Sequence, residues 1–337
     1  MFLGYLAKMT RPILITGASS GIGLELARRY ARVGKPLVLV ARNRERLTRA
    51  TDELAGLSSG PIVTVSLDVA DGVAVNKSLT QAVQSHGVPE LVINAAGVVN
   101  VGRFLEMDTD YFDANLRIDF EGTVNVCRAL APLMVAAGSG HIVNIASVAG
   151  YLGIYGYTGY SAAKFAVMGF SEALRFEMKP LGVTVSVVCP PDTKTPGFAA
   201  EQAARPVETE AIAGSIAPVD ADLVAEKIVK GINAKRFYII IGTTSKFYFR
   251  LKGLLPEVFL AIVDSDVRKA QKGSAQKSAV QKSNAQLGRK SSVSSGHLRD
   301  LFSHDIYSPS VCLPEHIALN RGGSTRHSDC ALRCQEG

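Results

Sequence analysis

The chain has 337 residues, 47% of them hydrophobic and 20% charged, which suits one large α/β domain with extensions or two small domains. Its net charge of +7 is unevenly distributed, because the segment from Gln271 onward holds nine Lys or Arg against five Asp or Glu and so carries +4 of the total. The remainder is only slightly basic, which argues against a nucleic-acid partner.

The N-terminal residues and the cysteines bear on the cellular compartment. Residues 1–8 contain one short apolar stretch without a cleavage-site pattern, too short to span a membrane or to direct export. The five cysteines are an odd number, which favours a reducing compartment over a disulfide framework. We therefore expect a cytoplasmic protein. No metal site is expected, because His327, Cys330 and Cys334 are only three candidate ligands in a polar segment.

The first expected elements are a buried strand over residues 12–16 and an amphipathic helix over residues 21–33, joined by a glycine-rich turn. Such a turn lets the backbone approach a pyrophosphate, while the helix offers free N–H groups and the positive end of its dipole. The motif is informative because it follows a strand and opens a helix. The residues expected to contact a dinucleotide here are Gly17, Ser19, Ser20, Gly21, Ile22 and Gly23.

The second strand is expected over residues 36–41. The residue that follows this strand selects between NAD and NADP. A carboxylate at this point would accept hydrogen bonds from the ribose 2′-hydroxyl of NAD. The chain has Arg42 instead, and a guanidinium suits a 2′-phosphate, so we predict NADP(H). We interpret Arg44 and Arg46 as solvated residues of a helix start.

The third and fourth strands are expected over residues 62–67 and 91–94. The turns that follow these two strands complete the predicted cofactor site. Asp68 can accept a hydrogen bond from the adenine amino group, and the fourth strand ends beside the cofactor. The other contact residues expected in these turns are Val69, Asn94, Ala95 and Gly97.

Short β-branched segments alternate with helix-length segments along most of the chain. Continuous apolar strands separated by helices are typical of a parallel sheet covered on both faces. The predicted fold class is therefore α/β, a doubly wound parallel sheet of the Rossmann type in a single domain over residues 10–245. The remaining expected strands cover residues 141–146, 183–189 and 237–241.

An expected helix over residues 158–179 carries two candidates for acid–base chemistry. Tyr160 and Lys164 are four residues apart and share a helix face, where the ammonium can favour deprotonation of the phenol. A phenol with an ordinary pKa near 10 thereby becomes usable at physiological pH. The hydroxyl of Ser147 can hold a carbonyl that is being reduced. The spacing is common in helices, so its meaning depends on the other motifs.

Residues 190–218 are rich in Pro, Ala, Thr and Glu and have no strand pattern. In a doubly wound sheet, a long insertion after a strand lies at the carboxyl edge, where ligands bind. We interpret this segment as a loop that covers the substrate, and an ordinary surface connection is the alternative. A helix over residues 220–233 is expected to follow.

The segment 246–262 is apolar but contains four charges and a proline, so it is not a clean spanning helix. It can lie in a membrane interface or cap a hydrophobic mouth, and the alternative is a terminal helix packed on its own domain or on a second subunit. Residues 246–270 are thus expected to form an apolar helical extension. In residues 271–337 Lys, Ser and Gln dominate, which predicts a disordered tail.

Five motifs occur in the order found in the short-chain dehydrogenase/reductase family, which the chain resembles over roughly residues 10–245. They are TGASSGIG at 16–23, the Asp68 turn, NAAG at 94–97, Ser147 and YSAAK at 160–164. The resemblance implies that Tyr160 donates a proton to the carbonyl oxygen, that Lys164 lowers the pKa of Tyr160 and binds the nicotinamide ribose, and that Ser147 holds the carbonyl. It implies hydride delivery by NADPH and cofactor contacts from Pro190, Thr193 and Thr195.

The chain departs from the family pattern at Asp119, where the family has a helix asparagine that completes a proton relay near the lysine. In the family the main-chain carbonyl at this position does much of the work of holding the water of this relay, so an aspartate can serve as a catalytic residue here. If the carboxylate instead pairs with Lys164, we expect the pKa of that lysine to rise and its effect on Tyr160 to weaken.

A narrower likeness lies in PPDTKTPGF at 190–198, since most of the family has Pro-Gly at its start. This form is similar to the subfamily that reduces the ketone of long-chain sphingoid bases. It implies NADPH-dependent reduction of a lipid-like ketone, 3-ketodihydrosphingosine, to dihydrosphingosine in sphingolipid synthesis. Each methylene of such a substrate contributes about 0.8 kcal/mol to binding when it is buried. Phe198 and the segment 247–262 can supply the apolar surface that buries it, unless these residues are ordinary core.

Two other functions stay open. A reductase or dehydrogenase of another apolar carbonyl, such as a steroid, retinoid or fatty ketone, would share every catalytic motif. An inactive cofactor-binding regulatory protein is disfavoured by the intact Ser147, Tyr160 and Lys164, and only Asp119 favours it.

The family resemblance also implies a homo-oligomer, which pairs through the helices at 108–137 and 158–180. A membrane-facing segment 246–262 would suit a lipid substrate. The protein would then lie peripherally on the cytosolic face of a membrane, the endoplasmic reticulum in a eukaryote.

Overall fold

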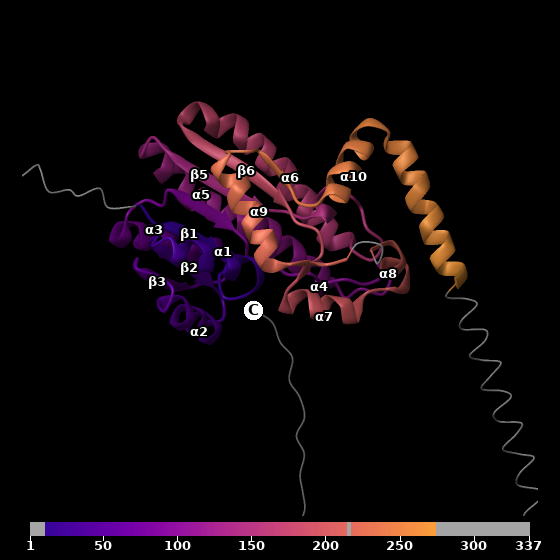
Figure 1. Cartoon of the computed structure of the whole chain (residues 1–337), viewed down its shortest axis with the longest axis horizontal. Coiled ribbons are helices and arrows are strands. Elements are labelled where there is room, and N and C mark those ends of the chain that lie inside the picture. Colours follow the sequence, from indigo (N-terminus) through magenta and orange to yellow (C-terminus); the bar gives the residue numbers. More distant parts are fainter. Residues whose placement is uncertain (1–10, 214–216, 274–337) are drawn as a thin grey trace, which may run out of the picture. The chain divides into compact units, whose positions relative to one another are not determined.

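Seven parallel strands form the central sheet of the computed structural model, which describes residues 11–213 and 217–273. The strand order is β3-β2-β1-β4-β5-β6-β9, so the chain reverses its direction of winding between β1 and β4 (Figure 1). The strands are β1 (Ile13–Thr16), β2 (Leu37–Ala41), β3 (Ile62–Ser66), β4 (Leu91–Asn94), β5 (Gly140–Ile145), β6 (Val183–Cys189) and β9 (Tyr238–Ile240). The predicted α/β doubly wound sheet is confirmed.

Helices cover both faces of the sheet, as the alternation of segments predicts. On one face α1 packs against α2 and α9, and on the other α3 packs against α5. Side-chain caps fix the starts of α2 and α3, where Asn43 and Asp71 accept from the backbone N–H groups of Arg46 and Ala74. The bounds are α1 (Gly21–Arg32), α2 (Arg44–Ala55), α3 (Gly72–His86), α5 (Gly122–Ala136), α6 (Thr158–Met178) and α9 (Ala221–Asn233).

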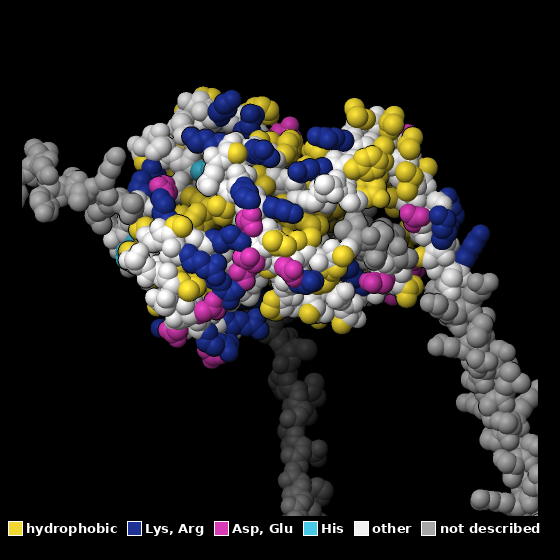
Figure 2. Space-filling model, in the orientation of Figure 1, with side chains coloured by type: hydrophobic (Ala, Val, Ile, Leu, Met, Phe, Trp, Pro, Cys, Tyr) yellow, Lys and Arg dark blue, Asp and Glu magenta, His cyan; other side chains and the backbone are white. Residues whose placement is uncertain are grey.

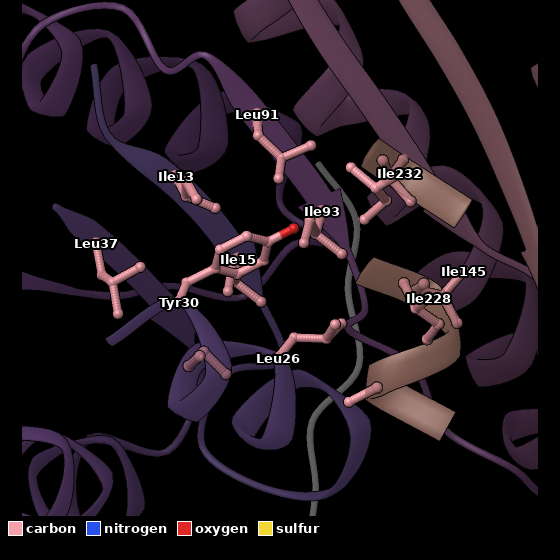
Figure 3. Close-up of a cluster of buried hydrophobic side chains, with 14 of the residues drawn as sticks. Ile13, Ile15, Leu26, Tyr30, Leu37, Leu91, Ile93, Ile145, Ile228 and Ile232 are labelled. Carbon is pink, nitrogen blue, oxygen red and sulfur yellow. The ribbon is translucent and has the colours of Figure 1, made fainter. Parts of the chain in front are cut away.

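Two apolar layers hold the helices on the sheet. In the layer drawn in Figure 3, strand residues such as Ile15 and Ile93 meet Leu26 of α1 and Ile228 of α9. The opposite layer joins the sheet to α3 and α5. Because both faces of the strands are covered, their sequences are apolar throughout rather than alternating. This is why the strands could be predicted from short apolar segments.

The helical stretch between β4 and β5 is irregular in the structure. It begins as α4 (Thr109–Ala114), passes through a π-helical turn, η1 (Asn115–Glu121), and continues as α5. A π-helical turn inside a helix is rare and often lies at a functional site. Here it carries Asp119, one of the candidate catalytic residues.

The segment 190–218 contains more regular structure than its sequence predicts. Two-residue strands, β7 (Thr193–Lys194) and β8 (Val219–Asp220), pair in parallel across it. Two short helices, α7 (Pro196–Ala204) and α8 (Val207–Ala213), lie between these strands, and Thr195 caps the first of them. Two-residue pairings leave no periodic pattern, which is why the sequence gives no strand signal here.

The C-terminal segment forms two helices, and hydrogen bonds join the first of them to the main domain. The first is α10 (Thr243–Leu254), and a second helix covers residues 256–273 after a break before Pro256. The Tyr151 hydroxyl donates to the carbonyl of Ser245, and the Lys252 ammonium donates to the carbonyl of Tyr151. None of the described helices is long and apolar enough to cross a bilayer. Helical structure thus continues past the predicted end at residue 270.

Several expectations concern residues outside the described part of the chain. The apolar stretch at 1–8, most of the predicted tail at 271–337, and its three candidate metal ligands belong to this group. Within the described residues, no group of three or more His, Cys, Asp or Glu is arranged to hold a metal ion.

Candidate active site

A cavity of about 1070 Å³ opens at the carboxyl edge of the sheet. It spans the point where the winding reverses between β1 and β4, which is the usual ligand crevice of such sheets. Six strand ends contribute to its wall. Residues that directly follow these strands and line the cavity are Gly17, Arg42, Leu67, Ala95, Ala146 and Pro190.

The glycine-rich turn leaves space and donors for a pyrophosphate. Gly17 has a φ of +67°, and a β-carbon there would lie 2.6 Å from the carbonyl oxygen of Ala95. A β-carbon on Gly23 would lie 2.4 Å from the carbonyl oxygen of Gly17. The helix α1 that follows has no side-chain cap at Ser20, so its first N–H groups face the cavity without a capping oxygen. The turn therefore fits a dinucleotide, as predicted.

We expect Gly23→Ala to weaken NADPH binding by about tenfold and to lower the free energy of unfolding by about 1–3 kcal/mol, because the new methyl group displaces backbone atoms. Titration of the variant with NADPH, followed by nicotinamide fluorescence, measures the first effect. Gly169→Ala is the matched control, since a β-carbon at Gly169 in α6 meets no atom within 4 Å. Equal affinities for the two variants would contradict the tight turn.

The adenosine end of the cavity is lined by Arg42, Asp68 and Val69, as predicted. An Arg42 guanidinium nitrogen lies 3.5 Å from a carboxylate oxygen of Asp68, and both side chains are substantially exposed. Arg46 also lines the cavity, and it is an exposed residue of the first turn of α2, as interpreted from the sequence. Arg44 is absent from the described lining. Arg42 precedes the N-cap Asn43 while Arg46 lies inside α2, so helical spacing does not relate them and the sequence marked them only as basic residues around a helix start.

Asn94 is not among the described residues that line the cavity, and its assignment as a cofactor contact stays a prediction. Its side chain is buried beneath the turn, where its amide nitrogen donates to the Asn144 side-chain oxygen at 2.8 Å. Ala95 and Gly97 of the same motif do line the cavity. Successive residues of a strand point to opposite sides, so a motif at a strand end supplies both structural and ligand-facing residues.

Three of the four predicted catalytic residues, Ser147, Tyr160 and Lys164, line this cavity. Ser147 follows β5 and Tyr160 lies in the first turn of α6. Lys164 is one helical turn further along, and its ammonium lies 5.5 Å from the centre of the Tyr160 ring. The ammonium donates to the carbonyl of Ile145 at 3.1 Å, which holds the lysine against the end of β5.

Asp119 lies directly behind Lys164 and does not line the cavity. One carboxylate oxygen accepts from the backbone N–H of Val98 at 2.7 Å. The other lies 3.8 Å from the Lys164 ammonium and accepts no hydrogen bond from any described residue. Burial raises the pKa of Asp119 to about 6, while the charge of Lys164 opposes this shift. The carboxylate therefore pairs with the lysine, which is one of the two arrangements considered from the sequence.

Tyr160 keeps its proton more firmly than the family resemblance implies. Burial raises its pKa above the ordinary value, and the negative charge of Asp119 raises it further. The neighbouring Ser147 hydroxyl acts in the opposite direction. A phenol that stays protonated at neutral pH suits a proton donor, which is the role needed for reduction of a carbonyl.

The segment after β6 contributes Pro190, Thr193 and Thr195 to the lining, as expected for cofactor contacts. The Thr193 hydroxyl donates to the carbonyl of Pro191 at 2.7 Å, and the Thr195 side chain lies near Gly21 of the glycine-rich turn. Residues of the glycine-rich turn and of the segment after β6 therefore line the same cavity.

Other lining residues were missed by the motif analysis. Near Tyr160 the cavity is polar, with Tyr157, Asp192 and Glu201 in its wall. The lining also contains apolar side chains, and several of them come from the C-terminal helices. Only the apolar composition of the segment 246–262 indicated such a role. These apolar side chains include Leu152, Ile154, Phe198, Tyr248, Phe259, Ile262 and Val263.

Comparison with known proteins gives the same assignment for sequence and fold. The short chain dehydrogenase family model matches residues 11–206. The 3-ketodihydrosphingosine reductase of Bos taurus is 36% identical over 235 residues, which are 68% of this chain and 71% of the bovine protein. The narrower likeness seen in the sequence is thereby confirmed.

Two solved structures share the architecture. A short-chain dehydrogenase/reductase from Burkholderia phymatum in complex with NAD matches with a TM-score of 0.66 and 28% identity, over 74% of this chain and 94% of that chain. A short-chain dehydrogenase from Sphingobium yanoikuyae in complex with NADPH matches with a TM-score of 0.61 and 26% identity, over 73% and 95% of the two chains. Since the match runs from the first strand into the segment after β6, the chain belongs to the short-chain dehydrogenase family and is an oxidoreductase of alcohol and carbonyl groups.

Proposed function

We propose that the chain uses NADPH to reduce the ketone of 3-ketodihydrosphingosine, giving dihydrosphingosine. The observation that carries this proposal is the presence of Ser147, Tyr160 and Lys164 in one cavity whose lining also includes the glycine-rich turn and an apolar wall from the C-terminal helices. Relatives from cattle and zebrafish, each 36% identical to this chain, bear the names 3-ketodihydrosphingosine reductase and 3-dehydrosphinganine reductase.

The chain's own residues bind, orient and protonate. When bound, NADPH supplies the hydride that reduces the carbonyl carbon. The Ser147 hydroxyl holds the carbonyl oxygen, and Tyr160 gives that oxygen its proton as negative charge develops there. Lys164 stabilises the phenolate that remains and binds the nicotinamide ribose, while Asp119 positions Lys164.

The apolar wall accounts for a lipid substrate. Tyr248 and Phe259 pack edge to face, and both belong to the C-terminal helices that close one side of the cavity. At about 0.8 kcal/mol for each buried methylene, a chain of several methylenes along this wall supplies most of the binding free energy. Phe198 contributes from α7. Ile212 and Ile216, which are also candidates for this surface, have no described side chains.

A competition between ketones tests the substrate. Purified protein with NADPH is assayed against 3-ketodihydrosphingosine and against a steroid ketone, with loss of reduced nicotinamide as the readout. We expect turnover of the sphingoid ketone with a kcat/KM at least about 100-fold above that of the steroid, since only the former places a long flexible chain on the apolar wall. Good steroid turnover without sphingoid turnover would favour the alternative, a reductase of another apolar carbonyl.

The preference for NADPH depends on Arg42 and Arg46. Charge-assisted hydrogen bonds contribute about 1.5–3 kcal/mol each, so we expect the double variant Arg42→Ala/Arg46→Ala to lose about 100-fold or more in kcat/KM with NADPH and little with NADH. Arg44→Ala is the matched control, because Arg44 belongs to the same helix turn but lies outside the described lining. An equal loss with both nucleotides would contradict a 2′-phosphate site.

We further propose that the C-terminal helices contact a membrane. Figure 2 shows hydrophobic side chains gathered over the part of the surface that these helices form. Basic residues accompany them, including Lys246, Arg250 and Arg268, and this combination suits an anionic lipid interface. The exposed apolar side chains are Phe247, Leu254, Leu255, Val258, Leu260 and Ile262. The protein would then work on the cytosolic face of a membrane, that of the endoplasmic reticulum in a eukaryote.

Flotation with vesicles tests this contact. We expect the protein to rise with vesicles that contain phosphatidylserine, and Leu254→Asp/Leu255→Asp to remain in the dense fraction with its turnover of a soluble short-chain ketone retained. From family resemblance we also propose a homo-oligomer, and a different result is expected if the apolar surface is its subunit interface. If the protein fails to float but the variant loses a dimer in sedimentation, this surface is a subunit interface instead.

A further inference from the structure

An ion-pair network lies beside the catalytic tyrosine on the substrate side of the cavity. Arg205 lies just after α7, and its guanidinium donates to Glu201 of α7 and, at 2.8 Å, to Asp192, which follows β6. The Tyr157 hydroxyl also donates to Glu201. The ring of Tyr157 lies 6.0 Å from that of Tyr160, so the network adjoins the reacting phenol.

The network has more negative than positive charge. Its two carboxylates, Asp192 and Glu201, face one guanidinium, and the guanidinium of Arg205 lies 5.0 Å from the Phe198 ring. Both carboxylates act on the active site, because their charges raise the pKa of Tyr160. Lys164, another cation of the described lining, already pairs with Asp119. A cationic group on the substrate would therefore balance the charge at this end of the cavity.

The two carboxylates differ in what they can still bind. The Glu201 side chain is 8% exposed and holds both Tyr157 and Arg205 through the same oxygen. The Asp192 side chain is 31% exposed and lines the cavity. Arg205 contacts only one of its oxygens, and the other accepts no hydrogen bond from a described residue. Asp192 is thus the carboxylate that remains accessible to a ligand.

We propose that Asp192 is a specificity-determining residue that binds the ammonium group of an α-amino ketone substrate, held in place by Arg205 and Glu201. This inference rests on the proposed function. In 3-ketodihydrosphingosine the amino group is on the carbon next to the ketone, so a ketone held by Ser147 and Tyr160 places its ammonium within a few ångströms of the phenol. A charge-assisted hydrogen bond to Asp192 then fixes the orientation of the ketone.

The position of Asp192 fits such a role. It is the third residue of the PPDT sequence that distinguishes this chain from the Pro-Gly form of most of the family. Its carboxylate is held by a guanidinium whose own side chain is only 4% exposed, so it is fixed before any substrate arrives. Fixed donors and acceptors cost less to organise on binding than mobile ones. Glu201 and Arg205 act through Asp192 and are positioning residues.

The test compares two ketones on Asp192→Asn, which retains an oxygen that can accept from Arg205. One substrate is 3-ketodihydrosphingosine, and the other is 1-hydroxyoctadecan-3-one, which has hydrogen in place of the amino group. We expect the ratio of kcat/KM for the amino ketone to kcat/KM for the deaminated ketone to fall by about 10- to 100-fold, mainly through KM for the amino ketone. An unchanged ratio would overturn the proposal.

A matched control separates binding from loop structure. Glu208 is a buried acid in the next helix that pairs with Arg103 and lies outside the described lining, so Glu208→Gln disturbs the same loop without touching the cavity. We expect it to affect both ketones equally. If the wild-type protein reduces both ketones with the same kcat/KM, the ammonium site is refuted while the reductase activity stands. If it reduces neither, the proposed function itself fails.

Discussion

Replacement of Tyr160 by phenylalanine is expected to lower kcat for ketone reduction by about 10³-fold, because the variant has no proton to give to the carbonyl oxygen. The phenol is the acid nearest to the predicted carbonyl site, and its raised pKa keeps it protonated at neutral pH. The ring is retained, so the contact with Lys164 and the packing against Tyr157 persist. NADPH affinity should therefore change by less than about threefold.

Single-turnover kinetics and NADPH titration of the Tyr160→Phe variant separate these two effects. Tyr111→Phe is the matched control, because Tyr111 is an exposed residue of α4 outside the described lining. It should behave as the wild type. A Tyr160→Phe enzyme with more than about a tenth of wild-type kcat would assign the proton to another group.

The second large effect is expected from Lys164→Met. Loss of the ammonium removes the contact with Tyr160 and leaves the Asp119 carboxylate buried without a cation. Breaking a buried pair in this way costs about 3–5 kcal/mol of unfolding free energy, and we expect kcat/KM to fall by about 10²-fold or more. Urea denaturation and steady-state assays measure the two losses.

The loss of stability in Lys164→Met should depend on pH in a defined direction. In the folded wild-type protein the pKa of Asp119 is about 6, above its ordinary value of 3.8, so ionisation of this group opposes folding as the pH rises through that interval. Removal of the lysine, whose charge lowers this pKa, must raise it further. The deficit in unfolding free energy should therefore be greatest above pH 7 and shrink toward pH 5.

A double variant distinguishes the structural loss from the catalytic one. Lys164→Met/Asp119→Asn has no buried carboxylate, so most of the stability lost at pH 8 should return while activity stays low. The amide oxygen introduced at position 119 would still accept from the backbone N–H of Val98, as the carboxylate does. If stability fails to return, the charge of Asp119 is not what the lysine balances.

The fold and the centre of the site follow from local signals in the sequence. The strands are short apolar segments bounded by turns, and the helices between them have apolar faces, so local pattern alone indicates a doubly wound sheet. The glycine-rich turn is marked locally by the spacing of its glycines, although Gly17 makes its close approach to Ala95, which is distant in the sequence. Tyr160 and Lys164 are joined by helical spacing.

The parts that the sequence did not predict depend on contacts between distant residues. Asp192 follows β6 and Arg205 follows α7, and nothing in either segment marks them as a pair. The π-helical turn that buries Asp119 also has no simple periodic signal. The motif of Asn94 lies at the right strand end for a cofactor contact, but a motif does not specify which side chains point into the cavity.

The central claim is that Ser147, Tyr160 and Lys164 act beside a nicotinamide site on one ketone. Incubation of the protein with 3-ketodihydrosphingosine and NADPH that carries deuterium at both C4 positions tests this most directly, with mass spectrometry of the product. The account predicts dihydrosphingosine that contains one deuterium at C3, formed by the wild type and almost absent with Tyr160→Phe. Unlabelled product, or no product while the protein still binds NADPH, would contradict it.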